Sequence, residues 1–309
     1  MRIPHAILKC VGFISHDRPV PDYIGTVFVV GVASPLGGVY LNLVTAKHVT
    51  EDIDPGPFII CLKAKGRNRK IMLKSSDEWT WWHHPTEPDA VDVAVMPFAT
   101  ANLAEYDVEM VPEKIFVTQE EIEKSALGVG DETFSVGLFG PLSNDPHVDP
   151  VVRGGNIAMM PTQRIPTKDF GMVEAYVVES RSTGGLSGSP VFVRETVRLP
   201  TMIDADGETV SMSGVGRIHF LGLTHGHWDV EEYAKLMHSG MSIVVPARKI
   251  SEVLHHPELV QMREEADKTL AKKNLPVTDS AKPGLFTHDD FQSALKKASR
   301  RVKPKEKKQ

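Results

Sequence analysis

The segment from Thr183 to Phe192 reads TGGLSGSPVF and places one hydroxyl, that of Ser187, among small residues just before an apolar run. Glycines allow a tight turn and leave backbone amide hydrogens uncovered. If this turn forms, the amides of Gly185 and Ser187 converge on one point, where they would stabilise a developing oxyanion. Ser187 is therefore a candidate nucleophile for acyl transfer.

A serine hydroxyl needs a base to activate it and a third group to orient that base. Upstream, His48 follows the apolar run LNLVTA, and Asp92 opens the hydrophobic segment DVAVM. In acyl transfer His48 would take the proton of Ser187, while Asp92 would fix the imidazole tautomer and stabilise the imidazolium. This chemistry needs no metal and no organic cofactor, so none is predicted.

Three segments carry a resemblance to a known family. TAKHV around His48 resembles the Thr-Ala-x-His segment of trypsin-like serine proteases, DVAV at Asp92 resembles their Asp-Ile-Ala-Leu segment, and GLSGSP around Ser187 resembles their Gly-x-Ser-Gly-Gly-Pro segment. The order His, Asp, Ser is that of chymotrypsin-like proteases and differs from subtilisin and the α/β-hydrolases. Within the superfamily the chain is most similar to the bacterial glutamyl endopeptidase and heat-shock protease branches.

The resemblance spans about residues 24 to 254 and implies an enzyme of bacterial type. It implies a serine endopeptidase that hydrolyses peptide bonds of a peptide or protein substrate through an acyl-enzyme. In trypsin-like zymogens an aspartate precedes the nucleophile and pairs with a newly cut amino terminus, whereas Leu186 stands there in this chain. We therefore expect a site that forms without proteolytic activation, with Leu186 packed among apolar side chains.

Specificity is predicted from the same resemblance. Arg181 and Ser182 fall where the family builds the pocket for the residue before the cut, and the opposite wall would come from His225 and His227. Such a pocket would favour a carboxylate over a cation, so we expect a preference for acidic residues. Two alternatives stand beside this one: a one-residue loop shift would send Arg181 to solvent, and His225 would instead contact the candidate aspartate.

The elements that must position these residues are strands. Alternating β-branched and aromatic runs, separated by Gly, Pro and Asp, predict two sets of strands: 25–30, 39–44, 57–62, 70–73 and 92–96, then 133–138, 156–160, 173–179, 191–193, 218–224 and 242–245. The 24 glycines and 22 prolines fit a turn-rich β protein. We expect an all-β chain with two Greek-key β-barrels of the chymotrypsin-like type and the active site in the cleft between them.

The predicted organisation has three parts. Residues 1–112 form an amino-terminal barrel that carries His48 and Asp92, and residues 113–258 form a second barrel that carries Ser187 and ends in a short helix at 247–254. Residues 259–309 form a charged tail, partly helical or disordered. Its basic end, 296–308, suits an anionic partner such as nucleic acid or a membrane surface, although a disordered solubilising tail explains it as well.

Composition points to the cytoplasm. Only Cys10 and Cys61 are present, too few for the disulfide framework of secreted trypsins. The amino-terminal segment lacks the sustained apolar run of a signal peptide, and no window of about 18 apolar residues predicts a transmembrane helix.

Two alternatives concern function. The first is a metal site, because the sequence contains three histidine pairs: His225 with His227, His83 with His84, and His255 with His256. No third ligand stands at a metal-site spacing, so we predict no metal site. The second alternative is a protease-fold protein that binds peptides or regulates a partner with negligible turnover.

Overall fold

The computed structural model of the chain describes most of residues 3–272. The described ranges are 3–20, 22–53, 56–66, 70–76, 79–98, 103–138, 149–180, 186–198, 202–203, 209–210, 213–232 and 235–272. Within them no helix combines the length and apolar character needed to cross a membrane. The basic segment 296–308 lies outside these ranges, so its anionic partner stays a prediction.

The first unit is a seven-stranded sheet with the strand order β5-β4-β1-β2-β3-β6, to which β7 adds by pairing with β2. Its neighbours along that path are antiparallel, whereas β7 runs parallel to β2. The strands are β1 (Val11–His16), β2 (Asp22–Ala33), β3 (Val39–Thr45), β4 (Phe58–Lys63), β5 (Lys70–Lys74), β6 (Ala94–Pro97) and β7 (Val111–Pro112). The run Val27 to Val30 is apolar at every position because both faces of β2 are buried.

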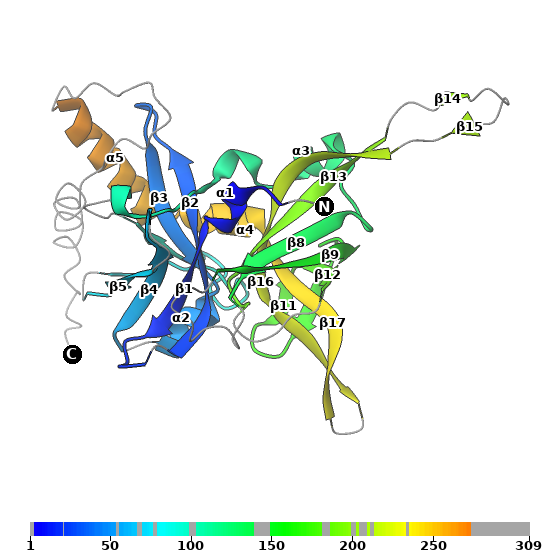
Figure 1. The fold of residues 1–309 in the computed structure, drawn as a ribbon, viewed down its shortest axis with the longest axis horizontal. Helices are drawn as coiled ribbons and strands as arrows, with labels where there is room; N and C mark the ends of the chain where they lie inside the picture. Colours follow the sequence, from blue (N-terminus) through cyan, green and yellow to red (C-terminus); the bar gives the residue numbers. More distant parts are fainter. Residues whose placement is uncertain are drawn as a thin grey trace, which may run out of the picture.

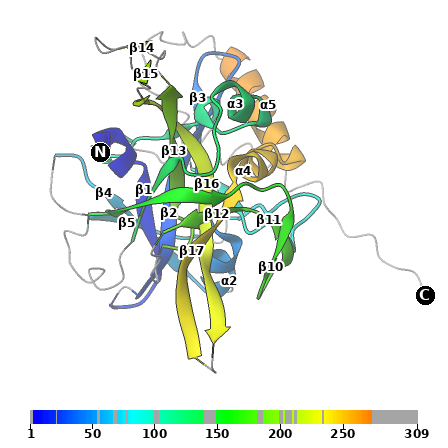
Figure 2. The same ribbon diagram turned by 90° about the vertical axis from the view of Figure 1, so that its right-hand side faces the viewer.

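The second unit is a closed barrel with the order β12-β17-β16-β13-β8-β9. Its strands are β8 (Glu132–Gly137), β9 (Val151–Met159), β12 (Tyr176–Glu179), β13 (Pro190–Arg198), β16 (Ser213–Glu232) and β17 (Lys235–Pro246). Two small hairpins join it, one of β10 (Arg164–Thr167) with β11 (Gly171–Glu174) and one of β14 (Met202–Ile203) with β15 (Thr209–Val210). Figure 2 shows β16 and β17 running on together as a long hairpin beyond the barrel.

The two units lie side by side (Figure 1), and one cluster of buried apolar side chains spans both. Phe28 of β2 packs against Phe220 of β16 with ring centroids 5.5 Å apart, and Phe116 contacts Phe220 in a tilted arrangement at 4.6 Å. A buried hydrogen bond also crosses the boundary, from the amide of Leu138 to Thr26 Oγ1 at 2.9 Å. Because aromatic pairs and buried hydrogen bonds are both sensitive to geometry, this shared core fixes one unit against the other.

The prediction of an all-β chain is confirmed, and the architecture agrees with the chymotrypsin-like fold. Most predicted strands match observed ones, but the run predicted at 173–179 divides into β11 and β12, which pair with different neighbours. Among the described strands the first unit is an open sheet with β5 and β6 at its two edges, whereas the second unit is a closed barrel. Strand β1, which pairs with both β2 and β4, was not predicted.

Helices are short except at the carboxyl end. They are α1 (His5–Leu8), α2 (Lys47–Ile53), α3 (Gln119–Lys124), α4 (Ala247–Leu254) and α5 (Pro257–Lys272), with 3₁₀ turns η1 (Leu103–Glu105) and η2 (Glu113–Ile115). Helix α4 has the predicted bounds. Helix α5 packs against the first unit, because Tyr40 Oη and Ser34 Oγ donate to Asp267 Oδ1 at 2.5 and 2.8 Å. The first residues of the predicted tail are therefore a docked helix.

Candidate active site

His48 lies in the first turn of α2, directly after β3. The helix buries Val49, Thr50 and Ile53, which leaves the His48 side chain 30% exposed toward the second unit. The strand end before it is fixed by Thr45 Oγ1, which donates to the carbonyl of Thr26 at 2.7 Å. The helix face and the strand end together set where the imidazole points.

Asp92 lies just before β6, in a segment that meets the His48 turn. Its side chain is 2% exposed. Asp92 Oδ1 accepts from the backbone amide of His48 at 2.9 Å, and Oδ2 lies 2.8 Å from His48 Nδ1. A carboxylate is only an acceptor, so His48 Nδ1 carries the hydrogen. In the neutral ring Nε2 is then unprotonated and is able to act as a base.

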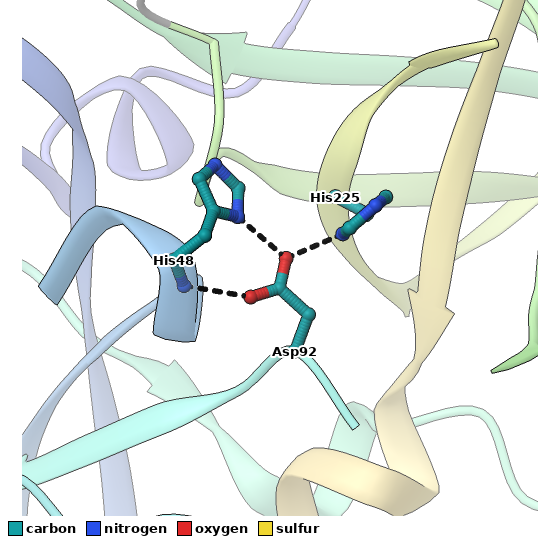
Figure 3. Close-up of side chains that lie close together, drawn as sticks. All are labelled: His48, Asp92 and His225. Carbon is teal, nitrogen blue, oxygen red and sulfur yellow. Dashed lines mark hydrogen bonds and ion pairs between the residues drawn. The ribbon is translucent and has the colours of Figure 1, made fainter. Parts of the chain in front are cut away.

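His225 of β16 contacts the same carboxylate from the other side. Its Nδ1 lies 2.5 Å from Asp92 Oδ2, and its ring stands edge-on to that of His48 with centroids 5.6 Å apart. Figure 3 shows both imidazoles converging on Asp92. The contact between His225 and Asp92, which the sequence analysis gave as the alternative to a pocket role, is thus present.

The shared carboxylate shifts two pKa values in opposite directions. Burial alone would raise the pKa of Asp92, but the hydrogen bonds from His225 and His48 hold it well below its usual range. Burial lowers the pKa of His48, yet the hydrogen bond and charge of Asp92, with the charges of Asp52 and Asp169, outweigh it and leave that pKa above its ordinary value. The His48 imidazole therefore becomes protonated, and can no longer accept a proton, as the pH falls through this raised value.

Ser187 lies in a turn before β13 that both units hold. The carbonyl of Ser187 accepts from the amide of Thr26 in the first unit at 2.9 Å, and the amide of Gly188 donates to the carbonyl of Thr224 in the barrel at 2.9 Å. Within the turn, the amide of Ser189 donates to the carbonyl of Leu186 at 2.9 Å. Leu186 is buried.

The Ser187 hydroxyl contacts the backbone of His225 and, among the described residues, does not bond to His48. Ser187 Oγ donates to the backbone carbonyl of His225 at 3.4 Å. Rotation about the serine χ1 is enough to re-aim a hydroxyl, and catalytic hydrogen bonds are often long before substrate binds. The structure therefore brings His48 and Asp92 together and places Ser187 at the same boundary.

Gly188 is the residue on which the turn depends. Its φ is +79°, and a Cβ there would lie 2.3 Å from the carbonyl oxygen of Thr26 and 2.4 Å from Thr45 Oγ1. We expect Gly188→Ala to lower the free energy of unfolding by about 2 kcal/mol or more, because the left-handed backbone and the contact both oppose a side chain. Urea unfolding measures this.

The matched control is Gly128→Ala. A Cβ at Gly128 would meet nothing within 4 Å, so this substitution is expected to change the free energy of unfolding by less than about 1 kcal/mol. Equal urea midpoints for the two variants would contradict the role given to Gly188.

Other predicted site residues lie beyond what the structure describes. Gly185, Arg181 and Ser182 fall in the segment 181–185, outside the described residues. His227 lies on β16, but its side chain is likewise outside them. The predicted oxyanion site and acidic pocket therefore stay predictions.

Sequence reasoning missed two supports of the site. Phe170, in the β10–β11 turn, stands edge-on to His225 with centroids 5.1 Å apart, and Lys47 Nζ lies 5.8 Å from its ring centre. Glu87, which starts the turn leading to Asp92, accepts from Lys249 of α4 at 2.6 Å and pairs with Arg164 of β10. No local pattern announces either contact, because each joins separate elements of the fold.

A cavity lies between the two units at the predicted cleft. It is lined by Glu87 and Asp92 from the first unit and by Arg164, His225 and Lys249 from the second. The hydrogen bonds from Lys249 and Arg164 lower the pKa of Glu87 to about 2, so this glutamate is ionised at neutral pH. Asp92 and His225 thus form one wall of a small charged cavity.

Three possible metal ligands lie together at the site, although no third ligand stands at a metal-site spacing along the sequence. The fold brings ligand atoms of His48, Asp92 and His225 within 4.8 Å of one another. The separations of 2.5 and 2.8 Å between Asp92 Oδ2 and the two imidazole nitrogens are those of hydrogen bonds. These three residues could hold a divalent cation only by giving up the shared protons.

Other histidines of the predicted pairs contact carboxylates. His84 Nε2 lies 2.5 Å from Glu252, and His255 Nε2 lies 2.9 Å from Glu113.

No family model and no curated protein sequence matches the chain. Among solved structures, it is similar to the apo protease domain of MamO from Magnetospirillum magneticum, with 12% identity, 80% of this chain and 96% of that chain covered, and a TM-score of 0.49. Deg5 has 15% identity, coverage of 80% and 87%, and a TM-score of 0.44. Rv3671c of M. tuberculosis H37Rv, a serine-to-alanine mutant in its inactive form, has 14% identity, coverage of 81% and 88%, and a TM-score of 0.43.

Proposed function

We propose that this chain, which has the fold of trypsin-like serine proteases, is a serine endopeptidase that hydrolyses peptide bonds through an acyl-enzyme on Ser187. The observation that carries the proposal is the contact between the buried Asp92 Oδ2 and His48 Nδ1, 2.8 Å apart. This pair fixes the tautomer in which His48 Nε2 accepts a proton. Ser187 is held at the same boundary by hydrogen bonds from both units.

In the proposed mechanism the serine oxygen attacks the scissile carbonyl carbon while His48 Nε2 takes the hydroxyl proton. The charge that forms on His48 is balanced by Asp92, and the oxyanion is held by the amides of Gly185 and Ser187. His48 then returns the proton to the leaving amine, and water hydrolyses the acyl-enzyme by the same steps.

Covalent labelling tests the proposal. A fluorophosphonate is expected to add to the folded protein, and peptide mass mapping is expected to place the adduct on Ser187. The labelling rate should fall as the pH drops through the raised pKa of His48, because a protonated imidazole no longer accepts the serine proton. The urea-unfolded chain is the control and should not react.

An unlabelled Ser187 in the folded chain would favour a peptide-binding or regulatory protein with negligible turnover. The hydrogen bond from Ser187 Oγ to the carbonyl of His225, rather than to His48, is the observation that makes this second function worth testing.

We further propose a preference for acidic residues before the cut. Support comes from the polar end of the barrel interior, where Arg153 of β9 pairs in register with Ser135 of β8, which in turn pairs with Val191 of β13. Arg153, Ser135, Thr224 and Ser242 line a cavity that also contacts Leu186, the neighbour of the nucleophile. A guanidinium among hydroxyls favours a carboxylate ligand.

Arg153→Gln is expected to lower the ratio of kcat/KM for glutamate over glutamine substrates by roughly 10- to 100-fold, the usual worth of a hydrogen bond to a charged group. Matched peptides that differ only before the cut measure this ratio. Arg217 of β16 has an exposed side chain, so Arg217→Gln serves as the control and should leave the ratio unchanged. An unchanged ratio in Arg153→Gln would refute the assignment.

We also propose a cytoplasmic location. Cys10 and Cys61, the two cysteines of the chain, are both buried and are not joined to each other by a disulfide, as expected of thiols in a reducing compartment.

A further inference from the structure

We propose that His225 is a positioning residue that shares Asp92 with His48 and thereby sets the protonation state in which His48 works as the base. This inference rests on the proposed protease function. It concerns a residue for which the sequence indicated a role in substrate binding.

The geometry shows one carboxylate with three donors. Asp92 Oδ2 receives both imidazole Nδ1 groups, at 2.8 Å from His48 and 2.5 Å from His225, and Oδ1 receives the backbone amide of His48 at 2.9 Å. At 2% exposure the Asp92 side chain has little room for water to replace a lost donor. The hydrogen bond that each imidazole makes to Asp92 Oδ2 therefore depends on the hydrogen bond made by the other (Figure 3).

His225 is held in this pose from several sides. Its neighbour Thr224 is fixed by two backbone hydrogen bonds to the serine turn, from Gly188 at 2.9 Å and to Ser189 at 2.8 Å. Phe170 stands edge-on to the ring with an interplanar angle of 87°, and the side chain is 15% exposed. His225 is thus a fixed partner of Asp92, and its own carbonyl accepts from Ser187.

Competition for Asp92 Oδ2 gives His225 its effect. The Nδ1–H of His225 donates to the same oxygen that accepts from His48, so Asp92 stabilises a proton on His48 less than it would alone. Because His48 must become an imidazolium during the reaction, His225 tunes how readily His48 takes the serine proton.

Other charges near the two rings leave this competition in place. Asp52 and Asp169 act on His48 and favour its protonation. Around the cavity beside His225, Glu87 pairs with Lys249 and Arg164, and Glu174 pairs with Arg248. Since these groups are already paired with one another, Asp92 is the nearest charge that the two imidazoles share.

The test compares His225→Ala with His225→Asn by following the fluorophosphonate labelling rate of the full chain against pH, with EDTA present. In the wild type the acid limb of log rate against pH is expected to follow the protonation of His48. In His225→Ala its midpoint should rise by roughly half to one pH unit, since Asp92 then interacts with His48 alone. His225→Asn should keep the wild-type midpoint.

The asparagine variant separates positioning from packing. Its side-chain amide is able to donate to Asp92 as Nδ1–H does, so its plateau rate should stay within about threefold of the wild type, whereas His225→Ala should lose roughly tenfold. Circular dichroism establishes that each variant is folded. If His225→Ala fails to fold, His225→Phe, which keeps a ring but offers no donor, takes its place with the same expected midpoint.

The outcomes distinguish this inference from the proposed function. Labelling of the wild type with the same acid limb in all three proteins would overturn the inference and leave the protease assignment intact. An unlabelled wild type would remove the assignment. The inference would then be judged by the NMR titration of His48, where equal midpoints in the wild type and His225→Ala would overturn it and a raised midpoint in the variant would support it.

Discussion

Ser187→Ala is expected to lower kcat/KM for peptide hydrolysis by about 10⁴-fold or more, and to abolish fluorophosphonate labelling, while the chain stays folded. Among the described residues the hydroxyl makes one hydrogen bond of 3.4 Å, to a backbone carbonyl, so we expect little stability to be lost with it. The turn itself is held by backbone groups that alanine retains. Steady-state hydrolysis and urea unfolding measure the two quantities.

Ser189→Ala is the matched control. It is the same substitution two residues later, and it should lower stability while leaving the reactivity of Ser187 nearly unchanged. Ser189 is fully buried, and its Oγ contacts Thr26 Oγ1 at 3.1 Å across the boundary between the units. Its loss is expected to cost about 1 kcal/mol of stability and to leave the labelling of Ser187 within about threefold of the wild type. Hydrolysis that survives in Ser187→Ala would mean that another residue is the nucleophile.

The sequence was sufficient to find the catalytic candidates because each lies in a short motif with its own local geometry. His48 follows a strand at a helix start, and Ser187 lies in a glycine-flanked turn. No local motif shows that His48 and Asp92 come together, because 44 residues separate them along the chain. The resemblance of three ordered motifs supplied that step.

The partners of those residues were not predictable with the same certainty. The sequence left His225 between a pocket wall and a contact with Asp92, because one residue of register decides which way a strand side chain points. Strand β16 shifts register between Thr224 and Gly226, and no residue type marks such a shift in advance. The side chain of His227 on the same strand lies outside the described residues.

The fold was predictable as strands and less so as connections. The division of residues 173–179 into β11 and β12 follows from pairing with two different partners, which alternation of residue types does not encode. The docking of α5 depends on Asp267 meeting Tyr40, 227 residues away along the chain. Long-range partners of this kind decide topology, while local patterns decide only the type of each element.

The charged contacts of Glu87 explain how helix α4 supports the site. Lys249 of α4 and Arg164 of β10 both pair with Glu87, whose carbonyl accepts from the amides of Ala90 and Val91 just before Asp92. Because these pairs lower the pKa of Glu87 to about 2, their stabilising effect is present at neutral pH and is lost as the pH falls toward that value. The position of Asp92 thus depends on elements of both units.

Asp92→Asn is expected to reduce kcat/KM by about 10⁴-fold, the loss typical of the equivalent change in a serine protease triad. The amide removes the negative charge that balances the His48 imidazolium, and its NH₂ group cannot accept from an imidazole. Since Oδ2 accepts from two imidazoles and Oδ1 from a backbone amide, either placement of the NH₂ leaves at least one buried donor unsatisfied. His48 is then free to adopt the tautomer that cannot take the serine proton.

Asp267→Asn is the control for this variant, because Asp267 is also a carboxylate with two hydroxyl donors, Tyr40 and Ser34, but joins α5 to the first unit. It should lower stability and keep hydrolysis within about threefold of the wild type.

The pH dependence of stability gives a second test of Asp92→Asn. Because the pKa of Asp92 is depressed, the stabilising effect of this carboxylate is present at neutral pH and is lost on acidification. Unfolding of Asp92→Asn should therefore depend less on pH in acid than unfolding of the wild type, and undiminished hydrolysis by this variant would remove Asp92 from the mechanism.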